Sequence, residues 1–350
     1  MRTRKLEGGS LAKGGLADGC VLCTRGSKMV LFVTGLCGTG CPYCPVSPEK
    51  KGNDVIYANE LRVTDLDDVF AEVDSMNAEG TGITGGDPFV TLGRTADFIR
   101  MLKERYGKEH HIHLYTSTID LQKTMILADA GLDEVRFHPT VSMWSRLTET
   151  ELKDIVKIEG LRVGLEVPAL PDRADDLIKL VRDAGTIGVH FINLNELEFS
   201  ESNWDMMSSY DVKDDVSAAV FGSRELAEDL IRISDVPIHF CSSSFKDSVQ
   251  LRRRLIRRAE HTAREMDVIT DDGTLIVGVL YADDVRGAAD LLKKNYDVPE
   301  DLICIRPDGR SMEVAPWVLE ELAGELPFRC YLSERYPTSD RLEVERTPLN

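Results

Sequence analysis

Residues 28–45, KMVLFVTGLCGTGCPYCP, join a short apolar run to three closely spaced cysteines. The run from Lys28 to Thr34 is continuous, contains β-branched residues and is followed by glycine, which predicts a buried strand. Cys37, Cys41 and Cys44 then follow in a loop that contains glycine and proline. The stretch therefore predicts a strand with a functional loop at its carboxyl end.

Strand patterns recur after this stretch, and a helical pattern separates each from the next. The expected strands cover residues 82–84, 111–116, 135–138, 161–167 and 189–194, with a seventh at 236–241 and a long helix at 248–266. One helix is expected to begin at Thr64 and to close at Gly80, and others cover residues 94–106 and 172–184. Six βα units in series require a parallel sheet with right-handed crossovers. The pattern does not choose between an open doubly wound sheet and a closed or partly closed barrel.

The pattern changes after residue 266. Strands are expected at 274–281, 302–306 and 329–332, and helices at 283–295 and 317–322. This region of roughly 80 residues has the size of a small α+β domain. We therefore expect an N-terminal segment (1–28) with a C-x-x-C pair, an α/β domain (29–266) and an α+β domain (267–350).

Composition excludes some classes of protein. The net charge of −18 argues against a surface built as a whole to bind nucleic acid. No apolar stretch approaches the roughly 18 residues that span a bilayer, and the first twenty residues lack a signal-peptide pattern, so we expect no membrane partner and a cytoplasmic location. In that compartment the eight cysteines should be thiols or metal ligands rather than disulfides, and five of them fall within residues 20–44.

The spacing of Cys37, Cys41 and Cys44 suits an iron–sulfur cluster. Three thiolates can hold a cubane [4Fe–4S] cluster and leave one of its irons without a protein ligand. That iron could bind a substrate or cofactor, as the open position of a catalytic zinc does. A zinc knuckle or buried free thiols are the alternatives. Zinc usually takes paired C-x-x-C units and a fourth ligand, and structural cysteines prefer strands and helices, so the pattern favours the cluster.

The sequence Cys37-x-x-x-Cys41-x-Tyr43-Cys44 resembles the signature of radical S-adenosylmethionine (SAM) enzymes, including the aromatic residue before the last cysteine. The resemblance covers about residues 29–194 and is closest to proteins similar to pyruvate formate-lyase activating enzymes, in a largely archaeal branch. It implies a partial (β/α)6 TIM-like barrel. It also implies that the three cysteines bind a [4Fe–4S] cluster whose open iron is chelated by SAM. Reductive cleavage of SAM would then give a 5′-deoxyadenosyl radical that abstracts hydrogen from a substrate.

A second motif, Gly85-Gly86-Asp87-Pro88, ends the second expected strand. It resembles the family's Gly-Gly-Glu-Pro motif, whose backbone carbonyls receive the SAM ammonium group, with Asp87 where glutamate is usual. Polar residues at other strand ends are expected by the same resemblance to contact SAM. A buried Glu166 would need a partner, and a ribose diol would serve. The predicted cofactor-binding residues are Tyr43, Gly85, Gly86, Asp87, Pro88, Ser117, Glu166 and Asn193.

The pair Cys20 and Cys23 supplies half of a tetrahedral metal site, so a second iron–sulfur or zinc centre is one interpretation and free thiols are the other. Its expected partners are His239 and Cys241, at the end of the seventh strand. These meet the pair only if the N-terminal segment folds over the barrel. Cys304 and Cys330 are the second choice of partners, and their apolar neighbours favour core thiols.

Two further clusters of residues allow a functional and an ordinary interpretation. His111 and His113 share one face of a strand, but no carboxylate or cysteine is evident nearby, which favours a solvated strand start. The helix at residues 251–264 carries six arginines, which could bind RNA or a protein, or could pair with the chain's own acidic residues.

Two functions from different classes fit the sequence. The first is a radical SAM enzyme supplied with electrons by a donor such as a ferredoxin or flavodoxin. The second is a non-catalytic iron–sulfur or zinc-binding scaffold or electron-transfer protein.

Overall fold

The computed structural model describes residues 1–215 and 217–350. The chain divides into two compact units, one of residues 1–73 with 78–251 and one of residues 74–77 with 252–350. The expected domain boundary at 266/267 stays a prediction. The two units divide near residue 251, and helix α10 (Arg252–Thr262) falls in the smaller one.

The larger unit is built on seven parallel strands that lie side by side in chain order. They are β3 (Lys28–Phe32), β6 (Gly80–Thr84), β7 (His111–Thr116), β8 (Glu134–Phe137), β9 (Arg162–Pro168), β10 (Phe191–Asn195) and β11 (Ile238–Cys241). Antiparallel strands extend both edges, with β4 (Tyr57–Ala58) and β5 (Leu61–Arg62) beside β3 and with β2 (Leu11–Lys13) and β1 (Thr3–Lys5) beside β11. No strand pairing in the described part of the chain joins the two edges. The expected partial barrel of βα units is confirmed.

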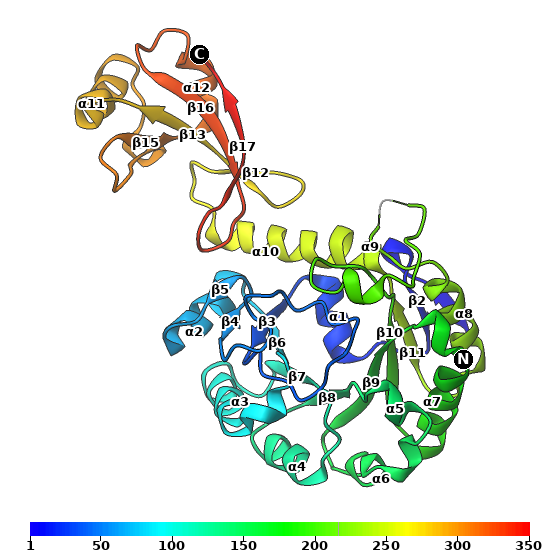
Figure 1. The fold of residues 1–350 in the computed structure, drawn as a ribbon. Coiled ribbons are helices and arrows are strands. Elements are labelled where there is room, and N and C mark those ends of the chain that lie inside the picture. The colour runs from blue at the N-terminus through cyan, green and yellow to red at the C-terminus, as the bar shows by residue number, and fades with distance from the viewer. Residues whose placement is uncertain (216) are drawn as a thin grey trace. The chain divides into compact units, whose positions relative to one another are not determined.

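Helices cover the outside of this curved sheet, as Figure 1 shows. They include α2 (Leu66–Ser75), α3 (Leu92–Tyr106), α4 (Leu121–Asp129), α7 (Ala174–Ile187) and α8 (Ser223–Ile233). In α3 the side chains of Phe98, Ile99 and Leu102 are buried on one face, and the helix ends at Gly107, as expected. The expectation that Gly80 closes α2 is wrong, because the helix stops at Ser75 and Gly80 is already the first residue of β6.

Helix α1 (Asp18–Arg25) lies inside the ring of strands rather than outside it (Figure 1). A β-carbon on Gly19 would lie 2.7 Å from the Arg136 guanidinium and 2.8 Å from the His113 ring, so glycine allows the helix to approach the sheet closely. The helix ends at Gly26, whose left-handed backbone (φ 69°) is typical of a helix C-terminus. Because β3 begins at Lys28, α1 fills the barrel at the amino ends of its strands.

The smaller unit is an antiparallel sheet covered by two helices, as an α+β domain requires. Its central strand β13 (Leu275–Tyr281) lies between β15 (Ser311–Val314) and β16 (Arg329–Arg335). β14 (Ile303–Ile305), β17 (Glu343–Pro348) and β12 (Val268–Ile269) complete the sheet. Apolar side chains of α11 (Val285–Asn295) and α12 (Pro316–Leu322) form a core with Leu280, Met312 and Val314. Of the helices that the structure describes, none has the length and apolar character needed to span a membrane.

Candidate active site

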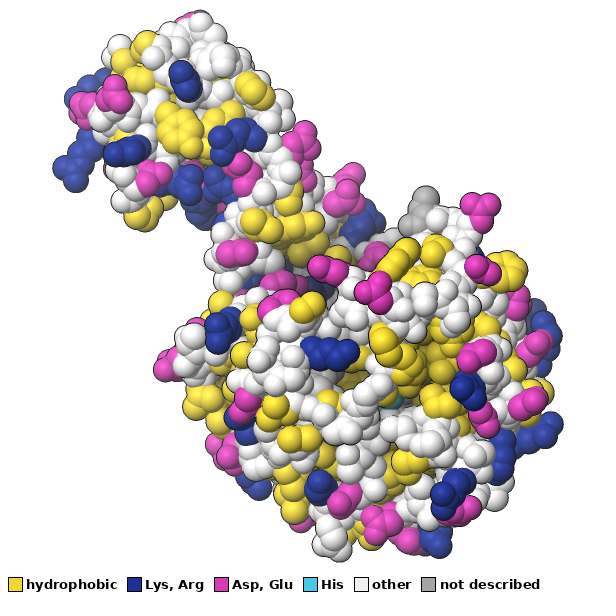
Figure 2. Space-filling model, viewed as in Figure 1, with side chains coloured by type: hydrophobic (Ala, Val, Ile, Leu, Met, Phe, Trp, Pro, Cys, Tyr) yellow, Lys and Arg dark blue, Asp and Glu magenta, His cyan; other side chains and the backbone are white. Residues whose placement is uncertain are grey.

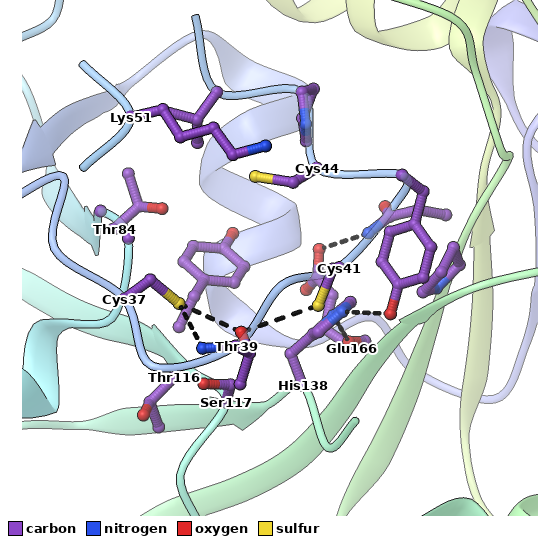
Figure 3. Close-up of a pocket in the computed structure, with 18 of the residues that line it drawn as sticks. Cys37, Thr39, Cys41, Cys44, Lys51, Thr84, Thr116, Ser117, His138 and Glu166 are labelled. Carbon is purple, nitrogen blue, oxygen red and sulfur yellow. Dashed lines mark hydrogen bonds between the residues drawn. The ribbon is translucent and has the colours of Figure 1, made fainter. Parts of the chain in front are cut away.

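The loop after β3 brings the three cysteines to one wall of a cavity of about 330 Å³. Figure 3 shows the side chains of Cys37, Cys41 and Cys44 around a common space, with His138 beside Cys41 and Ser117 at its lower edge. Catalytic groups of parallel βα folds lie on the loops that follow their strands, and this cavity occupies that end of the barrel.

Hydrogen bonds fix the base of the cysteine loop. The Thr34 hydroxyl donates to the carboxylate of Asp54 at 2.9 Å, and the Arg94 guanidinium makes two bonds to the same carboxylate at 2.6 and 2.8 Å. Arg94 also donates to the carbonyl oxygen of Val33, in the backbone that leads into the loop. Planar, bidentate arginine–carboxylate pairs are geometrically specific, so they set where the loop begins.

The Gly85–Gly86 turn lies directly against the cysteine loop. The backbone N–H of Gly86 donates to the Thr34 carbonyl at 2.6 Å, and that of Asp87 donates to the Leu36 carbonyl at 2.8 Å. A β-carbon on Gly86 would lie only 2.3 Å from the Leu36 oxygen, and one on Gly85 would lie 2.5 Å from the Thr34 oxygen. Both positions therefore require glycine because two backbones meet there. Gly85 and Gly86 both line the cavity beside the thiols.

Asp87 and Pro88 do not line that cavity. Asp87 is 1% exposed and accepts a hydrogen bond from the backbone N–H of Phe89 at 3.0 Å. It also accepts from three hydroxyls at the end of β7, those of Thr116, Ser117 and Thr118, at 2.7, 2.7 and 2.8 Å. Its carboxylate thus joins the ends of β6 and β7, which leaves only the backbone of the motif to face the cavity.

The surroundings of the thiols suit metal ligation. Desolvation raises the pKa of the Cys41 thiol, but hydrogen bonding with His138 and Thr39 outweighs that effect and lowers the pKa to about 7. His138 Nε2 lies 3.0 Å from the Tyr43 hydroxyl, and Nδ1 of the same ring lies 2.7 Å from the Glu166 carbonyl oxygen. A thiol with a lowered pKa forms the thiolate that binds iron. A β-carbon on Gly38 or Gly40 would meet no atom within 4 Å, so the loop leaves room for a bulky group. The three residues therefore fit a cluster ligand set.

Glu166 lines the cavity but already has protein partners. Its carboxylate accepts from Arg136 at 2.8 Å and from the Asn195 amide at 3.0 Å. Desolvation raises the pKa of Glu166, but the charge of Arg136 outweighs it and holds the pKa below its usual value. Sequence reasoning missed Arg136, and the available signal was an arginine within an otherwise apolar strand. Asn193 and Asn195 lie two residues apart on β10 and therefore on the same face of the strand. Asn195 lines the cavity, whereas Asn193 lies below it, with its amide oxygen 2.6 Å from His239 Nδ1.

The residues of the predicted second metal group make other contacts, and Cys20 and His239 share one of them, the amide oxygen of Asn193. The Cys20 thiol donates to Asn193 at 3.7 Å and accepts from Arg136 at 3.4 Å, whereas Cys241 contacts Gln250. Burial raises the pKa of Cys20 to about 12 and also raises that of Cys241, which keeps both thiols protonated. The described His, Cys, Asp and Glu side chains that converge closely enough for one ion are other residues, Asp18, His111 and Glu134. An auxiliary centre at Cys20, Cys23, His239 and Cys241 stays a prediction that this geometry does not favour.

Comparison with known proteins identifies the family. The family model for the radical SAM superfamily matches residues 31–142, which contain both the cysteine loop and the Gly-Gly turn, and a domain of unknown function (DUF8061) matches residues 273–349. Two solved structures show only distant likeness. The radical SAM methyltransferase TsrM from Kitasatospora setae is 14% identical, with a TM-score of 0.36 over 56% of this chain and 43% of that chain. Methylornithine synthase (PylB) is 12% identical, with a TM-score of 0.39 over 59% and 62%. These TM-scores are too low to support an argument.

A relative from Methanocaldococcus jannaschii carries the name “Putative glycyl-radical enzyme activating enzyme”. It is 38% identical over 359 residues, which cover 95% of this chain and 93% of the relative. An identity of this size over nearly both whole chains, together with the match at the cysteine loop, shows that the protein belongs to the radical SAM superfamily of enzymes.

Proposed function

We propose that the enzyme holds a [4Fe–4S] cluster on Cys37, Cys41 and Cys44 and binds SAM between that cluster and the Gly85–Gly86 turn. The observation that carries the proposal is that the three thiols and the turn line one cavity and that two backbone hydrogen bonds tie them together. The position of each therefore depends on the other. When bound, the cluster would supply the electron that cleaves SAM into methionine and a 5′-deoxyadenosyl radical, which would abstract hydrogen from the substrate.

The chain's own residues bind and orient SAM. The Gly85 and Gly86 carbonyls are suited to receive the SAM ammonium group, because both glycines line the cavity beside the thiols. Glu166 and Ser117 line the cavity, and their oxygens are suited to accept hydrogen bonds from the hydroxyls of the SAM ribose. Asp87 does not line the cavity but holds the backbone of the turn, and Asn193 does not line it either but donates to Asn195, which does. We therefore expect substitution of Asp87 to change the KM for SAM.

We propose that the substrate is a glycine residue of a partner protein, following the name of the M. jannaschii relative. The segment after β10 presents exposed apolar side chains, with Trp204 57%, Met206 66% and Phe221 66% exposed. The same segment contacts the cysteine loop, because the Asn203 amide donates to the Tyr43 carbonyl at 3.2 Å. Figure 2 shows hydrophobic side chains gathered beside a hollow on the visible face of the larger unit. Exposed apolar surface of this kind is typical of protein docking sites.

An RNA substrate has less support from the geometry. Arg264 of the Arg-rich segment pairs with Asp267 at 2.7 Å, and Arg252 pairs with Asp272 at 3.2 Å. Arg258 is buried and donates to the carbonyl oxygen of Pro337. Arginines that neutralise the chain's own groups contribute less to phosphate binding, so RNA binding through this helix stays a prediction.

Anaerobic reconstitution tests the proposed function. The wild-type enzyme should give a [4Fe–4S] signal whose EPR spectrum shifts on addition of SAM, and it should form 5′-deoxyadenosine when reduced with dithionite or with a ferredoxin or flavodoxin. A Cys37→Ala variant should lose both, whereas Cys304→Ala, which changes an exposed cysteine of the smaller unit, should keep both. An unchanged spectrum and no 5′-deoxyadenosine in the wild type would leave the non-catalytic iron–sulfur interpretation.

A further inference from the structure

Three side chains from distant parts of the sequence meet at the amino ends of the barrel strands. His111 is the first residue of β7, Glu134 is the first residue of β8, and Asp18 is the first residue of α1. We propose that they bind one divalent first-row metal ion, at a site separate from the cysteine cavity. None of the three lines that cavity.

The geometry is close to that of a bound ion. One ligand atom from each residue lies within 4.8 Å of the other two, and His111 Nε2 lies 3.9 Å from Glu134 Oε2. Nitrogen and oxygen ligands lie roughly 2.0–2.2 Å from a metal such as zinc, so two ligands of one ion are separated by about 3–3.5 Å. A separation of 3.9 Å is too long for a hydrogen bond but needs only a small side-chain movement to accommodate an ion between the atoms.

Unpartnered polar atoms point into the same place. Glu134 is fully buried, and its Oε1 atom forms an ion pair with the Arg136 guanidinium at 2.6 Å. Its Oε2 atom has no hydrogen-bond partner among the described residues, and neither has Nδ1 or Nε2 of His111. Buried polar groups are normally satisfied, so a carboxylate oxygen and an imidazole left unpaired beside each other require an explanation. A metal ion satisfies both.

The donor set and the charge define the class of ion. One imidazole with two carboxylates suits Mn²⁺, Fe²⁺ or Zn²⁺ better than an ion that prefers thiolates. Asp18 and Glu134 carry two negative charges, and the Arg136 that shares Glu134 with the ion also pairs with Glu166, so the group as a whole balances a divalent ion. Asp18 is exposed, so the third ligand can move and water can complete the coordination.

The ion would link α1 to the sheet. Asp18 belongs to the helix that fills the barrel, whereas His111 and Glu134 belong to two neighbouring strands. Coordination would therefore fix α1 beneath the cavity without any contact with the cofactor. This role predicts stabilisation by the ion that does not depend on the iron–sulfur cluster.

The test is a Mn²⁺ titration of the full chain with its cluster reconstituted anaerobically, with free Mn²⁺ followed by its EPR signal. We expect one Mn²⁺ per wild-type chain and a higher Tm in its presence. Asp18→Asn should weaken binding at least tenfold and His111→Gln should abolish it. Zn²⁺ should displace the bound Mn²⁺.

Two controls separate this site from helix charge and from the cysteines. Asp175→Asn removes an exposed acid from the first turn of α7 and should bind Mn²⁺ as the wild type does. Cys37→Ser should also keep the ion, even though it loses the cluster. The proposal is overturned if the wild type binds no Mn²⁺, if Asp18→Asn binds it with unchanged affinity, or if the ion is lost only with the cluster.

Discussion

Replacing Asp87 with alanine tests how the Gly-Gly turn is held against the cysteine loop. The Asp87 carboxylate accepts four hydrogen bonds, one from the backbone N–H of Phe89 and three from the hydroxyls of Thr116, Ser117 and Thr118. Asp120 offers a matched control, because it accepts the equivalent backbone bond at the start of α4, from Lys123 at 2.9 Å.

The expected loss follows from these bonds. The backbone bond alone contributes about 1 kcal/mol, as capping residues do. Each hydroxyl bond to the carboxylate contributes about 1 kcal/mol or somewhat more, since bonds to charged acceptors are the stronger class. Asp87→Ala should therefore lose about 4 kcal/mol of unfolding free energy, and Asp120→Ala about 1 kcal/mol.

Urea unfolding of the metal-free protein measures the difference. Trp144 is buried in the larger unit, and a Trp317→Phe background removes the tryptophan of the smaller unit from the fluorescence signal. With a slope of roughly 2–3 kcal/mol/M, a difference of about 3 kcal/mol moves the midpoint by about 1–1.5 M. If Asp87→Ala is no less stable than Asp120→Ala, the three hydroxyl bonds do not hold the turn and this reasoning is refuted.

Three other predictions concern the same unit. Gly86→Ala should lower 5′-deoxyadenosine formation at least tenfold, because its β-carbon would lie 2.3 Å from the Leu36 oxygen. Gly38→Ala is the control for folding: its β-carbon would meet no atom within 4 Å, so its Tm should equal that of the wild type. Arg136→Met leaves two buried carboxylates without their cation and should cost about 3–5 kcal/mol in urea unfolding, against under about 0.5 kcal/mol for the exposed Arg173→Met; equal losses would contradict it. Burial lowers the pKa of His110 and of His239 from 6.5 to about 4, so both histidines bind protons more readily in the unfolded state. The free energy of unfolding should be highest above pH 6.5 and fall towards pH 4, by up to about 3 kcal/mol per histidine. If His110→Gln and His239→Gln show the same pH dependence of this free energy as the wild type, the two histidines are not its cause.

The sequence predicted the barrel well because each βα unit carries a local signal. The run His111–Thr116 is strand β7 with the expected bounds, and helix α3 ends at Gly107 as its glycine indicates. The cysteine spacing and the Gly-Gly pair are equally local, so both could be found without a structure. The fold and the family could thus be predicted because each signal lies within a single strand, helix or loop.

What the sequence did not reveal depends on contacts between distant elements. For Cys20 and Cys23 the sequence left a metal site and free thiols open, and it did not reveal that both lie on a short helix that is buried among the strands. The sequence shows no carboxylate beside His111, because only the fold brings Glu134 and Asp18 close to it. Similarly, the Arg136 partner of Glu166 lies on another strand, so the sequence alone does not pair the two residues.

The polar interior of the barrel connects α1 with the cavity. Arg136 contacts the Cys20 thiol at 3.4 Å on one side and Glu166 at 2.8 Å on the other, and Glu166 accepts from Asn195 at the cavity. Apolar residues at these buried positions would often be as stable or more so, because buried ion pairs must offset a large desolvation cost. Stability alone therefore does not account for the network. Since Glu166 faces the proposed SAM site, the network is better explained by the fixed position and ionised state that Arg136 imposes on this carboxylate. An ion at Asp18 would fix the same network from its lower end, because Glu134 binds Arg136 and the metal through different oxygens.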